Sequence, residues 1–158
     1  MFVILSVSDS DKHFSWAIQE YEKRLSKEVK IENLKPFRWD NQSFVIEKET
    51  ENIISTIKKK YNWYQKILLI KEWKSYDTLE FSTMIKGKDF IFVIWWPYWV
   101  NEKTMKEAFP DLKEFSFWAI TLPHWLAKLT LIEQLYRATT IRTWKKYHYL
   151  NWAPKSRK

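Results

Sequence analysis

Residues 89–100, "DFIFVIWWPYWV", are the stretch that decides the fold of this chain. The first half, residues 89–94, is the clearest strand pattern in the sequence. A short apolar run rich in β-branched and aromatic side chains is typical of a strand buried on both faces. Such strands occur mainly in parallel sheets that helices cover on both sides. The stretch therefore predicts a central strand of an α/β fold, followed at once by a loop.

The segments on either side alternate between strand and helix patterns. Strand–helix–strand crossovers of this kind produce a parallel sheet with helices on both faces. We therefore predict a single α/β domain at residues 1–149 and a basic tail at residues 150–158. The last helix is expected to begin at Pro123, with Thr121 or Leu122 as its cap. The predicted strands are residues 2–7, 29–34, 66–70 and 89–94, and the other predicted helices are residues 15–25, 45–61, 78–85 and a short one after residue 104.

Composition and charge limit the classes of function. The chain has 158 residues, of which 46% are hydrophobic, and its 27 Lys and Arg against 19 Asp and Glu give a net charge of +8. An excess of basic over acidic residues favours polyanionic partners such as RNA. The absence of cysteine excludes disulfides, thiolate zinc sites and a cysteine nucleophile, and it suits a reducing compartment.

No membrane or targeting segment is expected. No apolar run approaches the roughly 20 residues of a membrane span. Residues 1–12, "MFVILSVSDSDK", lack a basic region before their apolar part, so we interpret them as the first strand and not as a signal peptide. These features predict a cytoplasmic protein.

Tryptophan and glycine occur in unusual numbers. Glycine occurs once, at Gly87, whereas tryptophan occurs 11 times. At an average usage of about 7%, a chain this long would carry about 11 glycines. Trp95, Trp96 and Trp99 follow the clearest strand, where the ligand-binding loop of a parallel α/β fold usually contains glycine. Trp144 follows the last helix, at a position where glycine commonly ends a helix.

Three interpretations of the tryptophans are open. They stack on nucleic-acid bases beside a basic surface, they pack in the core, or they stand where the natural protein has glycine. The third interpretation explains their placement best. UGA encodes glycine in some genetic codes and tryptophan in others, so translation with the wrong table exchanges the two residues. Glycines with ordinary codons would be spared, as Gly87 would be.

With glycine at these positions, the C-terminal half resembles the SPOUT-class large-subunit pseudouridine N3-methyltransferase H family, which acts on 23S ribosomal RNA. The resemblance is strong over about residues 66–149 and looser before them, where it rests chiefly on "AIQEYEKRL" at residues 17–25. Each motif alone is weak, but the ordered set is specific. The motifs are the loop at residues 95–99, "TLPH" at 121–124, "EQLYRA" at 133–138 and "YH" at 147–148.

The resemblance implies an α/β fold with a deep C-terminal trefoil knot, and a homodimer. It also implies that the chain uses S-adenosyl-L-methionine to methylate N3 of a pseudouridine in 23S rRNA, in an assembled ribosome. Loop backbone groups can bind adenine and ribose only at close approach, so Trp95 and Trp96 predict impaired cofactor binding in the chain as printed. The cofactor-binding residues would be Leu69, Trp95, Trp96, Phe117, Trp118, Ala119, Ile120, Thr121 and Leu122.

Candidate catalytic residues lie at both ends of the last helix. For His124, in its first turn, a role in orienting substrate and a purely structural role are both open. Tyr147 and His148 follow the helix in a polar segment, which the resemblance places over the active site of the partner subunit. Glu133 and Arg137, four residues apart, predict an intrahelical ion pair. The candidate RNA-binding residues are Lys128, Arg142, Lys145 and Lys146.

Other classes of function are less well supported by the residues. A metal site is not expected, because the spacing of His13, His124 and His148 matches no ligand motif. Two alternatives stay open. One is a non-catalytic, basic RNA-binding module that uses aromatic stacking, and the other is a SPOUT methyltransferase that acts on transfer RNA.

The coding DNA tests the glycine interpretation directly. We expect the codons of Trp95, Trp96 and Trp99 to be UGA and the codon of Gly87 to be an ordinary glycine codon. Sequencing the gene checks this expectation. UGG codons at the loop positions would show that the tryptophans are genuine.

Overall fold

A parallel sheet lies at the centre of the fold. The computed structural model describes the chain except residues 10–13, 71–75, 95–99, 118–121, 146 and 148–158. Within the described residues, five strands pair in parallel in the order β2-β1-β4-β3-β5. The strands are β1 (Phe2–Val7), β2 (Val29–Leu34), β3 (Gln65–Leu69), β4 (Phe90–Ile94) and β5 (Lys113–Phe115).

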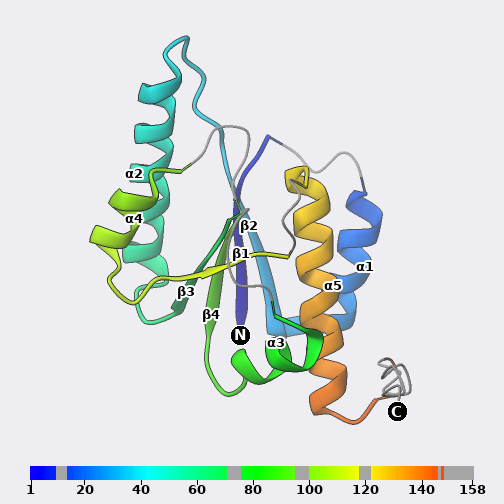
Figure 1. The fold of residues 1–158 in the computed structure, drawn as a ribbon. Helices are drawn as coiled ribbons and strands as arrows, with labels where there is room; N and C mark the ends of the chain where they lie inside the picture. Colours follow the sequence, from blue (N-terminus) through cyan, green and yellow to red (C-terminus); the bar gives the residue numbers. More distant parts are fainter. Residues whose placement is uncertain (10–13, 71–75, 95–99, 118–121, 146, 148–158) are drawn as a thin grey trace, which may run out of the picture.

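Helices cover both faces of this sheet (Figure 1). Helices α1, α3 and α5 pack on one face, and α2 and α4 pack on the other. A short 3₁₀ helix, η1 (Ser26–Glu28), leads from α1 into β2. The helices are α1 (Ser15–Leu25), α2 (Gln42–Lys60), α3 (Thr78–Met84), α4 (Glu102–Ala108) and α5 (His124–Arg142).

The alternation of side chains along the strands produces two separate cores. In β1, Phe2 and Ile4 pack in the core with α1, α3 and α5, whereas Val3 and Leu5 pack in the core with α2 and α4. Every residue of β1 is buried, and every residue of β4 is buried as well. The central position predicted for the strand at residues 89–94 is therefore confirmed.

The loops that follow the strands emerge at one edge of the sheet, which we call the carboxyl edge. They do so because all the strands run in the same direction. Leu69 pairs with Phe115 at the end of the β3–β5 ladder. The next N–H, that of Ile70, donates to the carbonyl of Phe115 at 2.9 Å. The pairing of β3 with β5 therefore continues to the start of both loops.

The predicted strands and helices are confirmed with small shifts at their ends. Helix α2 begins at Gln42 rather than at residue 45, because the side chain of Asn41 caps it by accepting from the N–H of Phe44 at 3.2 Å. The sequence does not predict β5. Its residues, "KEF", are too few to show a period and include two charged side chains.

The start of α5 differs from the prediction. Pro123 is the N-cap, with φ −56° and ψ 146°, and the helix begins at His124. The assignment of Pro123 to the first helical position, with Thr121 or Leu122 as the cap, is therefore wrong. The extended ψ angle keeps Pro123 outside the helix, while its carbonyl accepts from the N–H of Ala127 at 2.9 Å.

Two predictions about the C-terminal half fall on residues that the structure does not describe. The predicted trefoil knot belongs to the C-terminal half, in which residues 95–99 and 118–121 are not described, and the predicted basic tail is residues 150–158. Both stay predictions. The described residues establish the α/β class and the parallel sheet.

Helix α5 ends in a left-handed residue that is not glycine. Trp144 has φ 56° and is 91% exposed. Its N–H donates to the carbonyl of Ile141 at 3.4 Å, and the N–H of Lys145 donates to the carbonyl of Thr140 at 3.0 Å. This is the hydrogen-bond pattern of a Schellman cap, in which the left-handed residue is usually glycine. Trp144 therefore bears backbone strain without burying its ring.

Trp144→Gly should stabilise the protein by about 1 kcal/mol, because glycine adopts the left-handed conformation without steric cost. Denaturant unfolding of the variant and the parent measures the difference. Trp16→Gly is the matched control, since Trp16 is 73% exposed but lies within α1, where glycine weakens a helix. A loss of stability in Trp144→Gly would contradict the assignment of strain to residue 144.

Candidate active site

The described part of the predicted cofactor site lies at the carboxyl edge, after β3 and β5. Leu69 ends β3 and pairs with Phe115, which ends β5. The ring of Phe117 meets the ring of Phe115 edge-on, with centroids 4.9 Å apart. Leu69 and Phe117 are both half-buried, as is Leu122, which leads into α5. The structure therefore brings Leu69 and Phe117, two predicted cofactor residues, to neighbouring positions.

Other predicted site residues lie outside the described part of the chain, and their roles stay predictions. Strand β4, which precedes the loop at residues 95–99, pairs with β3 as far as Leu68 and Val93. It therefore ends beside the strand that carries Leu69. The predicted residues that are not described are Trp95, Trp96, Trp118, Ala119, Ile120, Thr121, Lys146 and His148.

His124 is the first residue of α5 and is half-buried. The next residue, Trp125, stacks on Phe14 with ring centroids 4.9 Å apart, which joins the first turn of α5 to the start of α1. Figure 1 shows this end of α5 at the carboxyl edge of the sheet. An imidazole in this position can orient a substrate bound at that edge.

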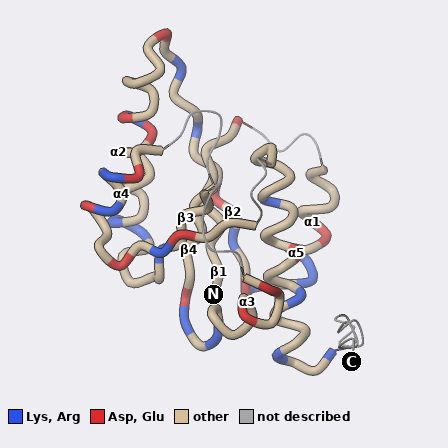
Figure 2. The backbone as a smooth tube through the Cα atoms, viewed as in Figure 1, with Lys and Arg blue, Asp and Glu red and all other residues tan. Residues whose placement is uncertain are grey.

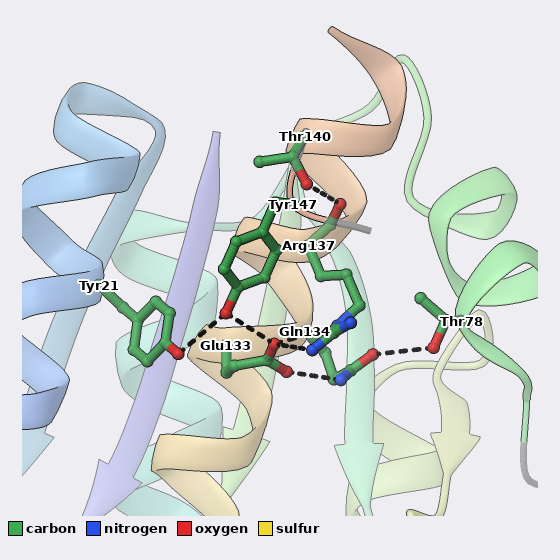
Figure 3. A network of polar contacts seen from close by, with 7 residues as sticks. All are labelled: Tyr21, Thr78, Glu133, Gln134, Arg137, Thr140 and Tyr147. Carbon is green, nitrogen blue, oxygen red and sulfur yellow. Dashed lines mark hydrogen bonds and ion pairs between the residues drawn. The ribbon is translucent and has the colours of Figure 1, made fainter. Parts of the chain in front are cut away.

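Tyr147, beyond the C-terminal end of α5, belongs to a network of polar contacts (Figure 3). Its hydroxyl lies 3.1 Å from the hydroxyl of Tyr21 in α1 and donates to Oε1 of Glu133 at 3.2 Å. Arg137 donates to the same oxygen at 3.0 Å and 2.6 Å, so the ion pair predicted between Glu133 and Arg137 is confirmed. The Arg137 guanidinium also lies 5.1 Å from the centroid of the Tyr147 ring.

Further contacts extend this network to a third helix. The ring of Tyr147 packs edge-on against the ring of Tyr136 at 4.7 Å. Gln134 donates to Oε2 of Glu133 at 2.6 Å, and its own side-chain oxygen accepts from Thr78 in α3 at 3.3 Å. The network therefore connects α1, α3 and α5 with the segment that follows α5.

These surroundings raise the pKa of the Tyr147 hydroxyl well above its ordinary value. Burial is the main cause, followed by the hydrogen bond with Tyr21 and the negative charge of Glu133. The hydroxyl therefore keeps its proton at neutral pH and acts as a donor. The folded-state pKa exceeds the unfolded value of about 10, so the protonated Tyr147 hydroxyl contributes to the stability of the folded state below about pH 10. This contribution is lost as the pH rises through the folded-state value.

The structure does not bring His124 and Tyr147 together within one chain. The hydroxyl of Tyr147 contacts Glu133, which lies nine residues beyond His124 (133 − 124). At a helical rise of 1.5 Å per residue, this separation is about 14 Å along the axis of α5. In this structure Tyr147 anchors the segment after α5 to its own chain, and its predicted role beside the substrate stays a prediction.

Lys128 is fully buried, with 0% of its surface exposed. Its ammonium donates to Oδ1 of Asn33 at 2.9 Å, and Ser6 donates to the same oxygen at 2.8 Å. Lys128 shares the inward face of α5 with Leu131 and Leu135, which brings it against β1 and β2. Lys128 is therefore not accessible to an RNA phosphate in the conformation described, and its role in RNA binding stays a prediction.

Two further candidate RNA-binding residues lie at the end of α5. Arg142 is half-buried, pairs with Glu28 at 3.5 Å, and places its guanidinium 6.0 Å from the centroid of the Phe2 ring. Lys145 is exposed. Lys145 is therefore accessible to a phosphate, whereas Arg142 would first have to leave its structural contacts. Their role in RNA binding stays a prediction.

Sequence reasoning missed Tyr21 and Asn33 as members of these clusters. The contact of Tyr21 with Tyr147 spans 126 residues, and the contact of Asn33 with Lys128 spans 95. A periodic pattern in the local sequence cannot indicate contacts between residues this far apart in the chain.

Metal-binding clusters and membrane-spanning helices are both absent from the described residues. These residues contain no group of three or more His, Cys, Asp or Glu side chains placed to hold a metal ion. No helix among them combines the length and apolar character that crossing a bilayer requires.

Tyr147→Phe should loosen the segment after α5, because the contacts of the hydroxyl with Tyr21 and Glu133 are lost while the ring contacts remain. We expect a loss of about 1 kcal/mol of stability and faster trypsin cleavage after Lys145, measured by denaturant unfolding and mass spectrometry. Tyr136→Phe, which keeps its ring against Tyr147, is the matched control. Equal cleavage of the two variants would contradict the anchoring role.

Known proteins resemble this chain along nearly its whole length. The family model described as "Predicted SPOUT methyltransferase" matches residues 1–148. The chain is 38% identical over 141 residues to the ribosomal RNA large subunit methyltransferase H of Thermodesulfovibrio yellowstonii, a match that covers 87% of this chain and 90% of the relative. Proteins of the same name from Lactobacillus delbrueckii subsp. bulgaricus and Mycoplasmopsis pulmonis are 36% and 30% identical, over 87% and 92% of this chain and 92% and 97% of theirs. On this match, the chain belongs to the SPOUT methyltransferase family.

Proposed function

We propose that this chain uses S-adenosyl-L-methionine to methylate N3 of a pseudouridine in 23S ribosomal RNA. Membership of the SPOUT family supports the class of reaction, and the names of its relatives support large-subunit ribosomal RNA as the substrate. The observation that carries the proposal is the placement of Leu69 and Phe117 beside Phe115, at the carboxyl edge of a parallel sheet. The family resemblance assigns both residues to the cofactor.

The described residues at this edge fit the proposed cofactor. Leu69 and Phe117 offer half-buried apolar surface beside loop backbone, which can accommodate an adenine ring and hydrogen-bond its edge. Leu69, residues 95–96 and residues 117–122 would hold the cofactor. When bound, S-adenosyl-L-methionine supplies a methyl group on a sulfonium that the acceptor nitrogen can displace. The protein then contributes orientation and the exclusion of water.

We propose that the natural protein has glycine at most of the positions where this chain has tryptophan. The exposed, left-handed Trp144 supports this interpretation. Glycine at positions 95 and 96 would let the backbone approach the cofactor, whereas two indole rings would occupy the space. We therefore expect weak cofactor binding by the chain as printed. Other tryptophans that are exposed rather than packed in a core are Trp16, Trp39 and Trp63.

Methylation at N3 requires a group that accepts or stabilises the departing proton. Tyr147 keeps its own proton at neutral pH, so it does not serve as the acceptor in the conformation described. His124 is the candidate at the carboxyl edge, either as the acceptor or as a residue that orients the base. His148 is the second candidate.

The proposal includes the trefoil knot and a homodimer. His124 and the segment after α5 lie far apart along α5 within one chain. A site that uses both would therefore take one of them from a second copy of the chain. We expect Lys145, which is exposed, and Lys146 to contact phosphates of an assembled ribosome, since lysines on a basic protein can attract them. The enzyme would act in the cytoplasm, where ribosomes work.

Calorimetry with S-adenosyl-L-methionine tests the cofactor site. We expect the Trp95→Gly/Trp96→Gly variant to bind the cofactor at least about tenfold more tightly than the chain as printed, a difference on the order of 1.4 kcal/mol. Trp63→Gly removes an exposed indole elsewhere and is the matched control. It should leave the affinity unchanged.

The outcomes separate the competing functions. Mass mapping of nucleotides after incubation with ribosomes and with transfer RNA identifies the substrate. A methyl group on transfer RNA alone would replace the ribosomal substrate, and an absence of cofactor binding in the glycine variant would favour a non-catalytic RNA-binding module.

A further inference from the structure

Lysine side chains gather at the edge of the sheet opposite the carboxyl edge, which we call the amino edge. The strands begin there because they all run in the same direction. Phe2, the first residue of β1, pairs with Val29 in β2 and with Phe90 in β4. Phe90 in turn pairs with Gln65, the first residue of β3. The segments that precede these strands therefore lie side by side along the amino edge.

Three of these segments bring exposed lysines to the amino edge. Lys27 precedes β2, and Lys86 and Lys88 lie in the turn that leads into β4. Lys58 and Lys59 are in the last turn of α2, the helix that leads into β3. Figure 2 shows Lys and Arg in the turn before β4 and toward the C-terminal end of α2. We call these five residues the amino-edge lysines.

The charge of the amino-edge lysines is not neutralised by the protein itself. None of the five has an ion pair within the part of the chain that the structure describes. The carboxylates at this edge are paired with other cations instead. These pairs are Glu28 with Arg142, Glu32 with Lys30 and Lys60, and Asp89 with the N-terminal amino group. The amino edge therefore carries an excess of positive charge.

The ends of helices explain only part of this charge. The C-terminal end of a helix carries partial negative charge, so Lys58 and Lys59 stabilise the end of α2. Lys86 and Lys88 lie beyond the last residue of α3, on either side of Gly87, whose φ of 74° turns the chain. Two like charges on one tight turn repel each other, and a bound polyanion removes that repulsion. The turn therefore favours an anionic partner.

The phosphate backbone of RNA is the anion that fits such a surface. Its charges are closely spaced along a chain, so one RNA molecule can contact lysines from several segments, whereas a small anion contacts one or two. Each phosphate that a lysine neutralises releases counterions, which drives association. The net charge of +8 suits such a partner, and the names of the relatives point to large-subunit ribosomal RNA.

The amino edge lies away from the proposed cofactor site. Strand β1 has six residues, which at about 3.3 Å per residue separate the two edges of the sheet by about 20 Å. The nucleotide to be methylated and the amino edge would therefore contact different segments of RNA. A folded particle that presents both segments binds more tightly than either segment alone, because the second contact is then intramolecular.

We propose that the amino edge is a second RNA-binding surface, at which the amino-edge lysines contact phosphates of ribosomal RNA while another RNA segment occupies the proposed methylation site. The inference rests on the proposed function for its RNA partner. It assigns a role to lysines that the cofactor site and the network around Tyr147 do not use.

Binding of the labelled full chain to assembled ribosomes over a series of salt concentrations tests the proposal. Lys58→Gln/Lys59→Gln removes two phosphate contacts, and glutamine keeps the helix propensity of lysine. The plot of log association constant against log salt should become shallower by about 1.4 to 1.8, at about 0.7 to 0.9 per phosphate. We expect the affinity to fall at least about tenfold at about 0.1 M salt. Lys86→Gln/Lys88→Gln should act alike, so the test does not depend on α2.

Lys48→Gln/Lys103→Gln is the matched control, because it removes the same amount of charge. Lys48 pairs with Glu51 at 2.8 Å, and Lys103 pairs with Glu107 at 4.0 Å. Lys48 lies in the first half of α2 and Lys103 in the first turn of α4, so neither is at the amino edge. The salt dependence of this variant should match that of the parent protein.

Equal salt dependence of the amino-edge variants and the control variant would overturn the inference, since position would then not matter. An effect with ribosomes that is absent with protein-free ribosomal RNA would also overturn it, because the partner would then be a ribosomal protein. The amino-edge variants should raise the KM for ribosomes and leave the cofactor affinity unchanged.

The proposed function fails separately, since it requires cofactor binding and methyl transfer. Salt-dependent RNA binding through the amino-edge lysines in a protein without methyl transfer would leave this surface assigned and the enzyme rejected.

Discussion

The parallel pairing of β1 with β4 is the constraint on which the rest of the structure depends. Every residue of both strands is buried, so helices must cover both faces of the sheet. The same pairing gives the strands one direction, which sends the loops after them to one edge. The two cores and the placement of Leu69 and Phe117 beside Phe115 both follow from this arrangement.

Helix α5 is held on this sheet by polar contacts as well as by apolar packing. Buried Lys128 donates a hydrogen bond to Asn33, and Glu133 accepts hydrogen bonds from both Arg137 and Tyr147. Buried charged groups are costly unless they are partnered, so a shift of α5 along the sheet would break these contacts as well as the apolar ones. The helix can therefore hold His124 at the carboxyl edge while it anchors the segment that follows its other end.

Several residues carry local features that the fold alone does not satisfy, among them Trp144 and Glu49. Trp144 adopts a left-handed conformation that favours glycine, and Glu49 has a buried oxygen without a donor among the described residues. Conflicts of this kind are expected where a site has a function or where a residue is not the natural one. The exposure of Trp144 fits the second explanation.

The sequence by itself determined the fold class, the order of most strands and helices, the ordered motifs of the family, and the pair of Glu133 with Arg137. All of these depend on residues that are near one another in the chain or recur with a local period. The strand β5 was too short to show such a period. Only the tertiary structure decided that Lys128 points inward, because a lysine has an apolar stem and a charged end and suits either face of a helix. It also decided the contact of Tyr21 with Tyr147 and the gathering of lysines at the amino edge, since these depend on how separate segments pack together.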